Sequence, residues 1–321
     1  MSSKKFYEEI NTLKGMAIVC VLLCHAIILY PINLLDNDVW REIFKFTGSV
    51  PMPLFFLISG YCFSYRGNYR EFIGKKFLRL MLPYIVFGLV DVIPRQVLSA
   101  FVNRPSSIGE SLKSMLLYGG QYWFLYTLFA VFAIYPFLYL IQKNSVVRMI
   151  IVEAVLLAVT LIETDVTVLC LNSVMQYLFF FNTGVMLKLL NIDIFAVDKI
   201  KPIPRVIVIV VLTVLWGSLS LFAPYTTVTR TVMGIIGSLC FFLLTKFRVT
   251  NWIFSRLGDY SLQLYLLNGF LLVISRTIIC SLTQIPIMIV AFNMLITLVC
   301  SYLFIKYFCK RFKFIRVLMG M

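Results

Sequence analysis

The chain has 321 residues, of which 61% are hydrophobic and only 13% are charged, and its mean hydropathy is +0.93. Soluble domains carry about 25% charged residues, so this composition excludes a soluble globular protein and indicates one that lies in lipid. The net charge of +15, from 29 Lys and Arg against 14 Asp and Glu, does not indicate nucleic acid, because no long basic run and no nucleic-acid-binding motif accompanies it.

Apolar runs of about 20 residues predict ten transmembrane helices, so we expect an all-α, polytopic membrane protein in which residues 1–321 form a single domain. The expected spans are 13–32, 46–65, 78–98, 121–141, 147–163, 167–190, 205–223, 230–247, 260–279 and 285–307. Residues 105–118 are expected to form a short helix on the membrane surface. No small-residue cleavage site follows the first apolar run, which is therefore interpreted as a membrane helix and not as a signal peptide.

The basic residues predict how these helices are oriented. Most of the 29 Lys and Arg fall at the two ends of the chain and in the loops expected on the same side of the membrane as those ends. Because cytoplasmic loops are enriched in Lys and Arg, this distribution predicts that both termini are cytoplasmic. The outer loops are short, so any chemistry must take place within the helical bundle or at its edge.

His25, the only histidine of the chain, lies in the first expected span. It is about 18 Å from the cytoplasmic end of that helix, near the bilayer centre, where an ionisable side chain is costly and is a candidate functional group. Lys14 precedes it by about three helical turns, so both side chains lie on one face, about 16 Å apart. This face suits a donor with an anionic head and a thin reactive tail, such as an acyl-CoA. The alternatives are a histidine that only hydrogen-bonds another helix and a lysine that only marks the cytoplasmic side.

The second expected span contains Pro51, Pro53 and Gly60, which predict a broken or closely packed helix. Such breaks are tolerated where the backbone lines a cavity or packs against protein. The hydroxyl groups of Ser59 and Tyr61 are candidates for a position near a reaction centre, although packing alone would also explain each of them.

The loop after the second span is densely basic, and Lys76 and Arg79 share one helix face at the start of the third span. Arg79 lies among apolar residues, which favours a phosphate or carboxylate partner for its guanidinium. Pro83 follows one turn later and is expected to bend the helix. Asp91, further along the same span, is interpreted either as a structural group or as a substrate-binding group.

Four segments in the first 130 residues resemble the membrane-bound acyltransferase family 3, the O-acyltransferases that modify bacterial surface polysaccharides and related molecules. They are Lys14-Gly15 through His25, PLFFLISGY at 53–61, KFLRLMLPY at 76–84 and WFL at 123–125. Any one segment is a weak match, but four in order at suitable spacing are specific. The chain departs from the family pattern at two positions. Lys76 replaces the usual first arginine, which loses bidentate phosphate contact but keeps the charge, and Asn268 stands where a histidine is often found.

The resemblance implies an acyl-CoA donor, usually acetyl-CoA, a hydroxyl acceptor on a sugar, and His25 as the essential group. It also implies that Lys14, Lys76 and Arg79 hold the donor, in a stand-alone enzyme of the bacterial plasma membrane without an extracytoplasmic domain. The candidates for contact with the acceptor are Trp123, Asp91 and Asn268. The eight cysteines lack the spacing of a zinc site, so no metal cofactor is expected.

The sequence therefore predicts a membrane O-acetyltransferase that uses His25, assisted by Ser59 or Tyr61, as a general base or a transient acyl carrier. A transporter or flippase for a lipid-linked sugar is the main alternative, since it too would need a cavity and intramembrane charges. The chain has no internal repeat of the kind that transporters show, which favours the enzyme. The expected partners are acyl-CoA, the acceptor glycan and the lipid bilayer, but not nucleic acid, and a homo-oligomer is left open.

Overall fold

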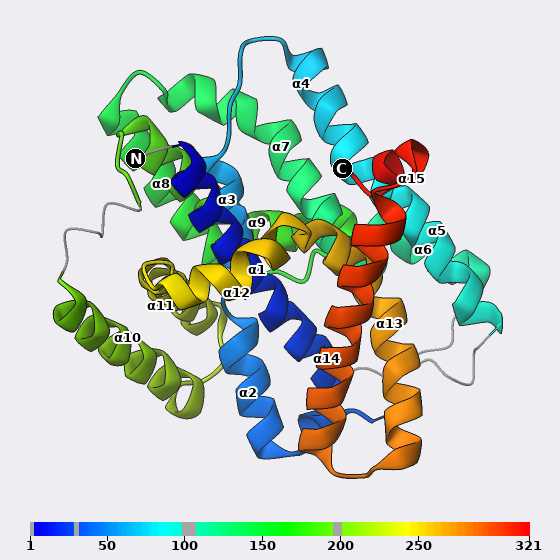
Figure 1. Cartoon of the computed structure of the whole chain (residues 1–321). Helices are drawn as coiled ribbons and strands as arrows, with labels where there is room; N and C mark the ends of the chain where they lie inside the picture. Colours follow the sequence, from blue (N-terminus) through cyan, green and yellow to red (C-terminus); the bar gives the residue numbers. More distant parts are fainter. Residues whose placement is uncertain (1–2, 29–31, 98–106, 195–200) are drawn as a thin grey trace.

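The computed structural model describes residues 3–28, 32–97, 107–194 and 201–321, and every regular element in this part of the chain is a helix (Figure 1). The α-helices are α1 (Ser3–Ile28), α2 (Asp38–Gly48), α3 (Pro51–Tyr61), α4 (Tyr69–Lys76), α5 (Leu82–Val97), α6 (Ile108–Tyr118), α7 (Trp123–Gln142), α8 (Val146–Thr160), α9 (Leu171–Leu189), α10 (Pro202–Phe222), α11 (Thr227–Leu244), α12 (Arg248–Asp259), α13 (Ser261–Leu282), α14 (Pro286–Phe304) and α15 (Lys313–Leu318). The short helical turns are η1 (Leu34–Asp36), η2 (Phe77–Met81), η4 (Gly120–Tyr122), η5 (Val168–Cys170) and η7 (Ile305–Cys309). The predicted all-α class is confirmed.

Eight helical segments of the described chain are long and apolar enough to cross a membrane, and they correspond to eight of the ten expected spans. The other two expected spans, 78–98 and 147–163, contain the shorter helices α5 and α8. Helix α8 has 15 residues and is about 22 Å long, which is less than the roughly 30 Å of a bilayer core. The multi-pass arrangement is confirmed, while the total of ten spans and the orientation of the termini stay predictions.

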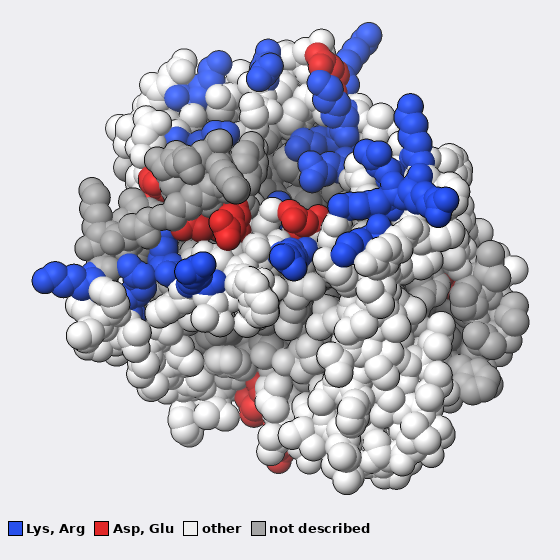
Figure 2. All heavy atoms as spheres, in the orientation of Figure 1, with Lys and Arg blue, Asp and Glu red and all other residues white. Residues whose placement is uncertain are grey.

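The surface of the bundle separates into an apolar part and a basic part. Helix α10 lies at the edge of the bundle in Figure 1, and its exposed side chains include Ile207, Val211 and Leu215. Such a surface would be unfavourable in water and is normal against lipid chains. Lys and Arg gather instead at one end, in the upper part of Figure 2, where α1 begins and α15 lies. The charge separation is the one expected of a protein embedded in a bilayer.

The second expected span is interrupted, as its prolines predicted. Helix α2 ends at Gly48, and α3 begins at Pro51. Beyond the break, α3 packs closely on α9, because a Cβ atom at Gly60 would lie only 1.9 Å from the carbonyl oxygen of Phe181. Glycine allows the two backbones to approach this closely, so Gly60 fixes the position of α3 relative to α9.

The short helix predicted at 105–118 is α6. Its N-terminus is capped by Ser107, whose hydroxyl accepts a hydrogen bond from the backbone N–H of Glu110 while the Glu110 carboxylate reaches back. It ends at Gly119, which has a φ of 75°, a left-handed conformation that glycine adopts without strain. The chain turns there, so that α7 begins at Trp123.

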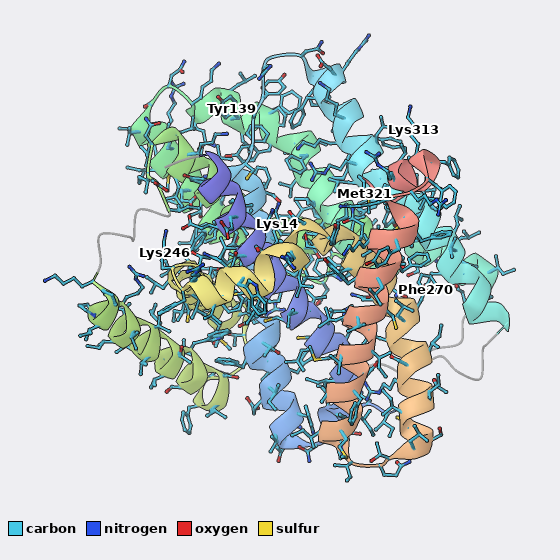
Figure 3. All side chains as sticks on the ribbon, viewed as in Figure 1. Lys14, Tyr139, Lys246, Phe270, Lys313 and Met321 are labelled. Carbon is cyan, nitrogen blue, oxygen red and sulfur yellow. The ribbon has the colours of Figure 1, made fainter. Side chains whose placement is uncertain are left out.

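Helix α12 crosses the beginning of α1 and holds it in place (Figure 3). Cβ atoms at Gly15 of α1 and at Gly258 of α12 would lie 2.0 Å and 1.7 Å from backbone carbonyl oxygens of the other helix. The buried ion pair between Lys246 and Glu9, with 2.8 Å between Nζ and Oε1, joins α1 to the turn that precedes α12. The crossing fixes the half of α1 that carries Lys14.

Candidate active site

A cavity of about 230 Å³, here called the inner cavity, lies between α1, α3, α7 and α13. Three cations from three elements line it, namely Lys14 of α1, Lys76 of α4 and Arg79 of η2. Among the described residues, no Asp or Glu lines this cavity, and none of the three cations forms an ion pair. The inner cavity therefore suits an anionic group, such as a phosphate.

Lys76 and Arg79 owe their position to an irregular stretch of helix. Helix α4 passes into the π-helical turn η2 and then into α5, where Pro83 has no N–H to donate to the Arg79 carbonyl. The Lys76 ammonium lies 3.8 Å from the ring centroid of Phe132, which is a cation–π contact. Burial, and next the positive charge of Arg79, lower the pKa of Lys76 to about 8, so this amine is mostly protonated near neutral pH.

A larger groove of about 930 Å³, here called the basic groove, adjoins the inner cavity, since Arg79 lines both. Its other cations are Lys75, Lys310 and Arg316. Asp259 is the single acidic side chain among the described residues that line it. Figure 2 shows Lys and Arg side chains of this end around a hollow in the surface. The groove has room for a ligand of nucleotide size, whereas the inner cavity admits only a thin extension of it.

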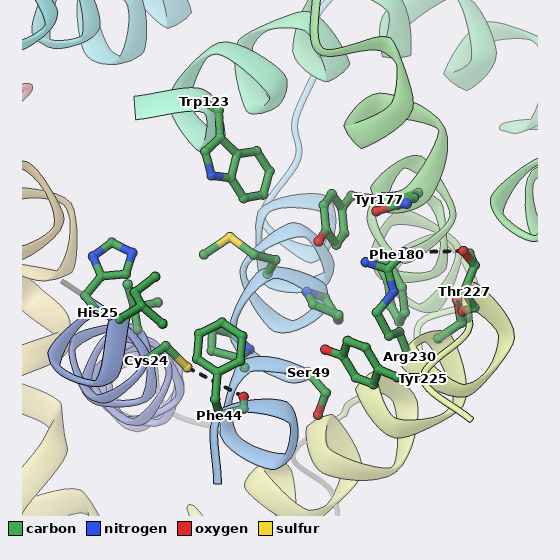
Figure 4. Close-up of a pocket in the computed structure, with 18 residues that line it drawn as sticks. Cys24, His25, Phe44, Ser49, Trp123, Tyr177, Phe180, Tyr225, Thr227 and Arg230 are labelled. Carbon is green, nitrogen blue, oxygen red and sulfur yellow. Dashed lines mark hydrogen bonds between the residues drawn. The ribbon is translucent and has the colours of Figure 1, made fainter. Parts of the chain in front are cut away.

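A third space, here called the outer cavity, has a volume of about 240 Å³ and contains the imidazole of His25 in its wall. In Figure 4, His25 and Arg230 lie on opposite sides of this cavity, with the rings of Trp123 and Tyr177 between them. Those two rings stack, with centroids 6.0 Å apart and an interplanar angle of 28°. The volume is slightly below the roughly 300–1,000 Å³ of most ligand pockets, so the outer cavity fits a single small ring and not a polymer.

The His25 imidazole is hydrogen-bonded to the side chain of Asn268 on α13. Asn268 is only 1% exposed, and its amide nitrogen has no hydrogen-bond partner in the described chain. The amide oxygen is therefore the atom that faces the imidazole, and it accepts from a ring N–H. This contact fixes one ring nitrogen as a donor and leaves the lone pair of the other for chemistry.

Arg276 holds the end of the helix that carries His25. Its fully buried guanidinium donates hydrogen bonds to the carbonyl oxygens of Ala26 and Ile32, at the C-terminal end of α1 and just beyond it. A cation is favourable at this position because the free carbonyl groups of a helix C-terminus point toward it. Since Ala26 follows His25 directly, Arg276 is a positioning residue for the imidazole.

Met52, in the first turn of α3, lines both cavities and separates them. Helices α7 and α1 also contribute residues to both cavities. At the start of α7, Trp123 lines the outer cavity and Phe124 the inner one, and along α1 the outer residue is His25 and the inner one is Lys14. The histidine and the cations thus lie on two sides of one partition at Met52.

The model of a family described as an acyltransferase domain matches residues 7–306. The chain belongs to acyltransferase family 3. Searches among curated proteins and among solved structures gave no significant match. The matched residues include both cavities and their partition, and with the apolar helices they make the chain a multi-pass membrane acyltransferase. The resemblance seen in the sequence is confirmed.

In this acyltransferase the structure brings together several of the predicted site residues. Ser59 lies in the inner cavity beside the three cations, and Trp123 lies in the outer cavity. Asn268, which stands where the family often has a histidine, contacts His25 itself. The segments at 53–61 and 123–125 that resemble the family therefore meet at the partition.

Two predicted site residues lie elsewhere. The Tyr61 hydroxyl donates to the carbonyl oxygen of Ile192 at 3.3 Å and lines neither cavity, and neither does Asp91 on α5. The structure also adds two residues that the sequence did not single out, the separating Met52 and the cavity-lining Arg230. Nothing in the sequence marks Met52, whereas Arg230 falls on the expected outer side, where the enrichment of cytoplasmic loops in Lys and Arg does not account for it.

Proposed function

We propose that this acyltransferase moves an acetyl group from acetyl-CoA to a hydroxyl group of a sugar, in the plasma membrane of a bacterium. The observation that carries the proposal is the division at Met52, which has cations without carboxylate partners on one side and the only histidine on the other. A CoA thioester has the matching chemistry, with phosphates at one end and a reactive carbonyl at the end of a thin arm.

The sizes of the spaces support this donor. The basic groove, at about 930 Å³, has room for the nucleotide of CoA, and the inner cavity, at about 230 Å³, has room only for its narrow arm. Arg79 lines both spaces, which places its guanidinium where the phosphates would leave the groove. Lys14 and Lys76 then lie along the first part of the arm, and Ser59 is available to hydrogen-bond it.

In this proposal His25, which lines the outer cavity, accepts the proton of an acceptor hydroxyl there. As the hydroxyl oxygen attacks the thioester carbonyl carbon, the carbon–sulfur bond breaks, and the proton held by the imidazole passes to the leaving thiolate. The products are the acetyl ester and the free CoA thiol. In the other route the free ring nitrogen of His25 attacks the thioester carbonyl carbon, the carbon–sulfur bond breaks and the CoA thiolate leaves. The acetyl-imidazole then passes the acetyl group to the hydroxyl, whose proton balances the thiolate. Both routes need the tautomer that Asn268 selects.

The test is acetyl transfer by the purified protein in lipid nanodiscs, measured as release of CoA thiol and as the gain of one acetyl group on a glycoside by mass spectrometry. His25→Ala is expected to slow transfer at least about 100-fold, the scale of general base catalysis, and to leave acetyl-CoA binding unchanged. Arg79→Ala is expected to weaken acetyl-CoA binding by about tenfold or more, because it removes charge-assisted hydrogen bonds.

Lys143→Ala is the matched control for the basic residues, since Lys143 is an exposed cation at the end of α7 and lines neither cavity. It is expected to behave as the wild type in both measurements. Unchanged transfer by His25→Ala would remove the imidazole from the mechanism. A transporter for a lipid-linked sugar would neither bind nor consume acetyl-CoA, so the absence of both in the wild-type protein would replace the proposal with that alternative.

A further inference from the structure

Arg230, in the first turn of α11, has no role in the reaction described above. It lines the outer cavity opposite His25 (Figure 4), and its Nη2 atom donates a hydrogen bond to the Thr227 hydroxyl at 3.3 Å. No ion pair of Arg230 occurs within the described chain, and no Asp or Glu is among the described residues that line this cavity. The guanidinium therefore brings a full positive charge into the cavity without an internal anion to balance it.

A second cation, Lys45, lies beside the same aromatic ring as Arg230, but it has a carboxylate partner of its own. The Arg230 Cζ atom and the Lys45 Nζ atom each lie 5.8 Å from the ring centroid of Tyr225, which lines the same cavity. Lys45 is balanced by Glu42, with 2.7 Å between Nζ and Oε1. Arg230 is the cation in this pair that remains available to a ligand.

Arg230 is partly exposed at this cavity, so an anion that enters the cavity can reach its guanidinium. Its planar guanidinium fits carboxylate and phosphate oxygens with two parallel hydrogen bonds, a geometry that lysine does not offer. The stacked rings of Trp123 and Tyr177 form an apolar wall between Arg230 and His25, of the kind that packs against the face of a sugar ring.

We propose that the acceptor carries an anionic group, a carboxylate or a phosphate, which pairs with Arg230 while the ring hydroxyl to be acetylated faces His25. This inference rests on the proposed function, because it names the class of acceptor for the same reaction. The anion has two sources, an acidic sugar or the phosphate of a carrier-linked sugar. Both present the same oxygen atoms to the guanidinium.

The experiment compares three probes, the neutral methyl β-glucoside, methyl β-glucuronide and glucose 1-phosphate, with the nanodisc protein. Two readouts are taken, the thermal shift that each probe alone produces and the kcat/KM for thiol release from acetyl-CoA. For the wild type we expect at least one anionic probe to give a thermal shift and a kcat/KM about tenfold or more above the neutral probe. A response to the glucuronide assigns the carboxylate source, and a response to glucose 1-phosphate assigns the phosphate source.

Arg230→Gln is expected to remove this preference for the anionic probe and to leave the KM for acetyl-CoA unchanged. Arg230→Lys is expected to restore part of it, since the charge returns without the planar fork. The matched control is Arg148→Gln on α8, which removes an exposed arginine outside both cavities and should keep the preference. Equal use of neutral and anionic probes by the wild type, or an equal loss for all probes in Arg230→Gln, would overturn the inference.

The two readouts separate this inference from the proposed function. Thermal shifts that depend on Arg230, without any release of CoA thiol, would leave the anion site standing and reject the acetyl-CoA reaction. Thiol release with no preference for an anionic probe would do the reverse.

Discussion

The close contact between α3 and α9 allows a stringent test of the fold around the partition. A Cβ atom at Gly60 would lie 1.9 Å from the Phe181 carbonyl oxygen, and ordinary van der Waals contact begins near 3.4 Å. Gly60→Ala therefore forces the two helices about 1.5 Å apart. The obstructing atom belongs to the backbone and cannot rotate away, and Gly184 on α9 meets the Leu57 carbonyl in the same way, at 2.1 Å.

Overpacking of this kind costs about 1–3 kcal/mol, and a rigid backbone neighbour favours the upper end of that range. With an unfolding entropy of about 2.1 cal/mol/K per residue, 321 residues lose about 1.5 °C of Tm per kcal/mol, so we expect a Tm lowered by about 2–5 °C, measured by scanning fluorimetry in nanodiscs. Acetyl transfer should fall as well, because α3 carries Met52 and Ser59 at the cavities.

Gly217→Ala on α10 is the matched control. Gly217 also lies inside a membrane helix, but a Cβ there would meet nothing within 4 Å. Alanine is the better helix former by about 1 kcal/mol, so this variant should melt at the wild-type temperature or slightly above it. If Gly60→Ala and Gly217→Ala melt together, α3 and α9 do not touch at Gly60, and the position of the partition argued from that contact is wrong.

Three further predictions concern the site. The kcat/KM for acetyl-CoA should fall by up to about tenfold from pH 7 to pH 9, because Lys76, with a pKa of about 8, loses its proton in that range. Lys76→Arg should flatten this pH profile, because arginine stays protonated throughout the range. Arg276→Gln removes two charge-assisted hydrogen bonds to the end of α1, so the unfolding free energy should fall by about 3 kcal/mol, and both Tm and kcat should be lower. An unchanged melting curve would contradict the capping role of Arg276. Met52→Trp should leave acetyl-CoA binding intact in calorimetry and slow transfer about 100-fold, whereas the volume-conserving Met52→Leu should retain activity.

The sequence was sufficient for those features that depend on short-range spacing. Apolar runs located the helices, and the three-turn spacing of Lys14 and His25 placed both on α1, where they line neighbouring cavities. Lys76 and Arg79, three residues apart, also come together in one cavity. The relation between Lys14 and His25 lies within one helix, where the 3.6-residue period fixes geometry without knowledge of the fold. Lys76 and Arg79 are joined by the π-helical turn η2, which that period does not describe, and only their closeness in sequence was predictable.

The remaining features depend on contacts between distant parts of the chain. Asn268 lies more than 240 positions after His25, and no local pattern indicates that their side chains meet. Arg230 enters the outer cavity only because α11 packs beside α3. Tyr61 was expected near the chemistry because it follows Ser59, but two residues on a helix differ by about 200° around its axis, and its hydroxyl turns to the Ile192 carbonyl instead.

The partition also explains why a membrane enzyme with one histidine in its sequence has three separate spaces in its described part. Under the proposed function, a thioester in the inner cavity is approached by water from the basic end, where no imidazole is available to activate it. The imidazole lies beyond Met52, in a cavity of about 240 Å³ that a single sugar ring would nearly fill. A hydroxyl group of that sugar ring is then the nucleophile closest to the basic nitrogen of the imidazole. The same ring displaces water from the cavity. Selectivity for acetyl transfer over hydrolysis would follow from the size of the outer cavity and from the ion pair between Arg230 and the acceptor, rather than from a moving lid.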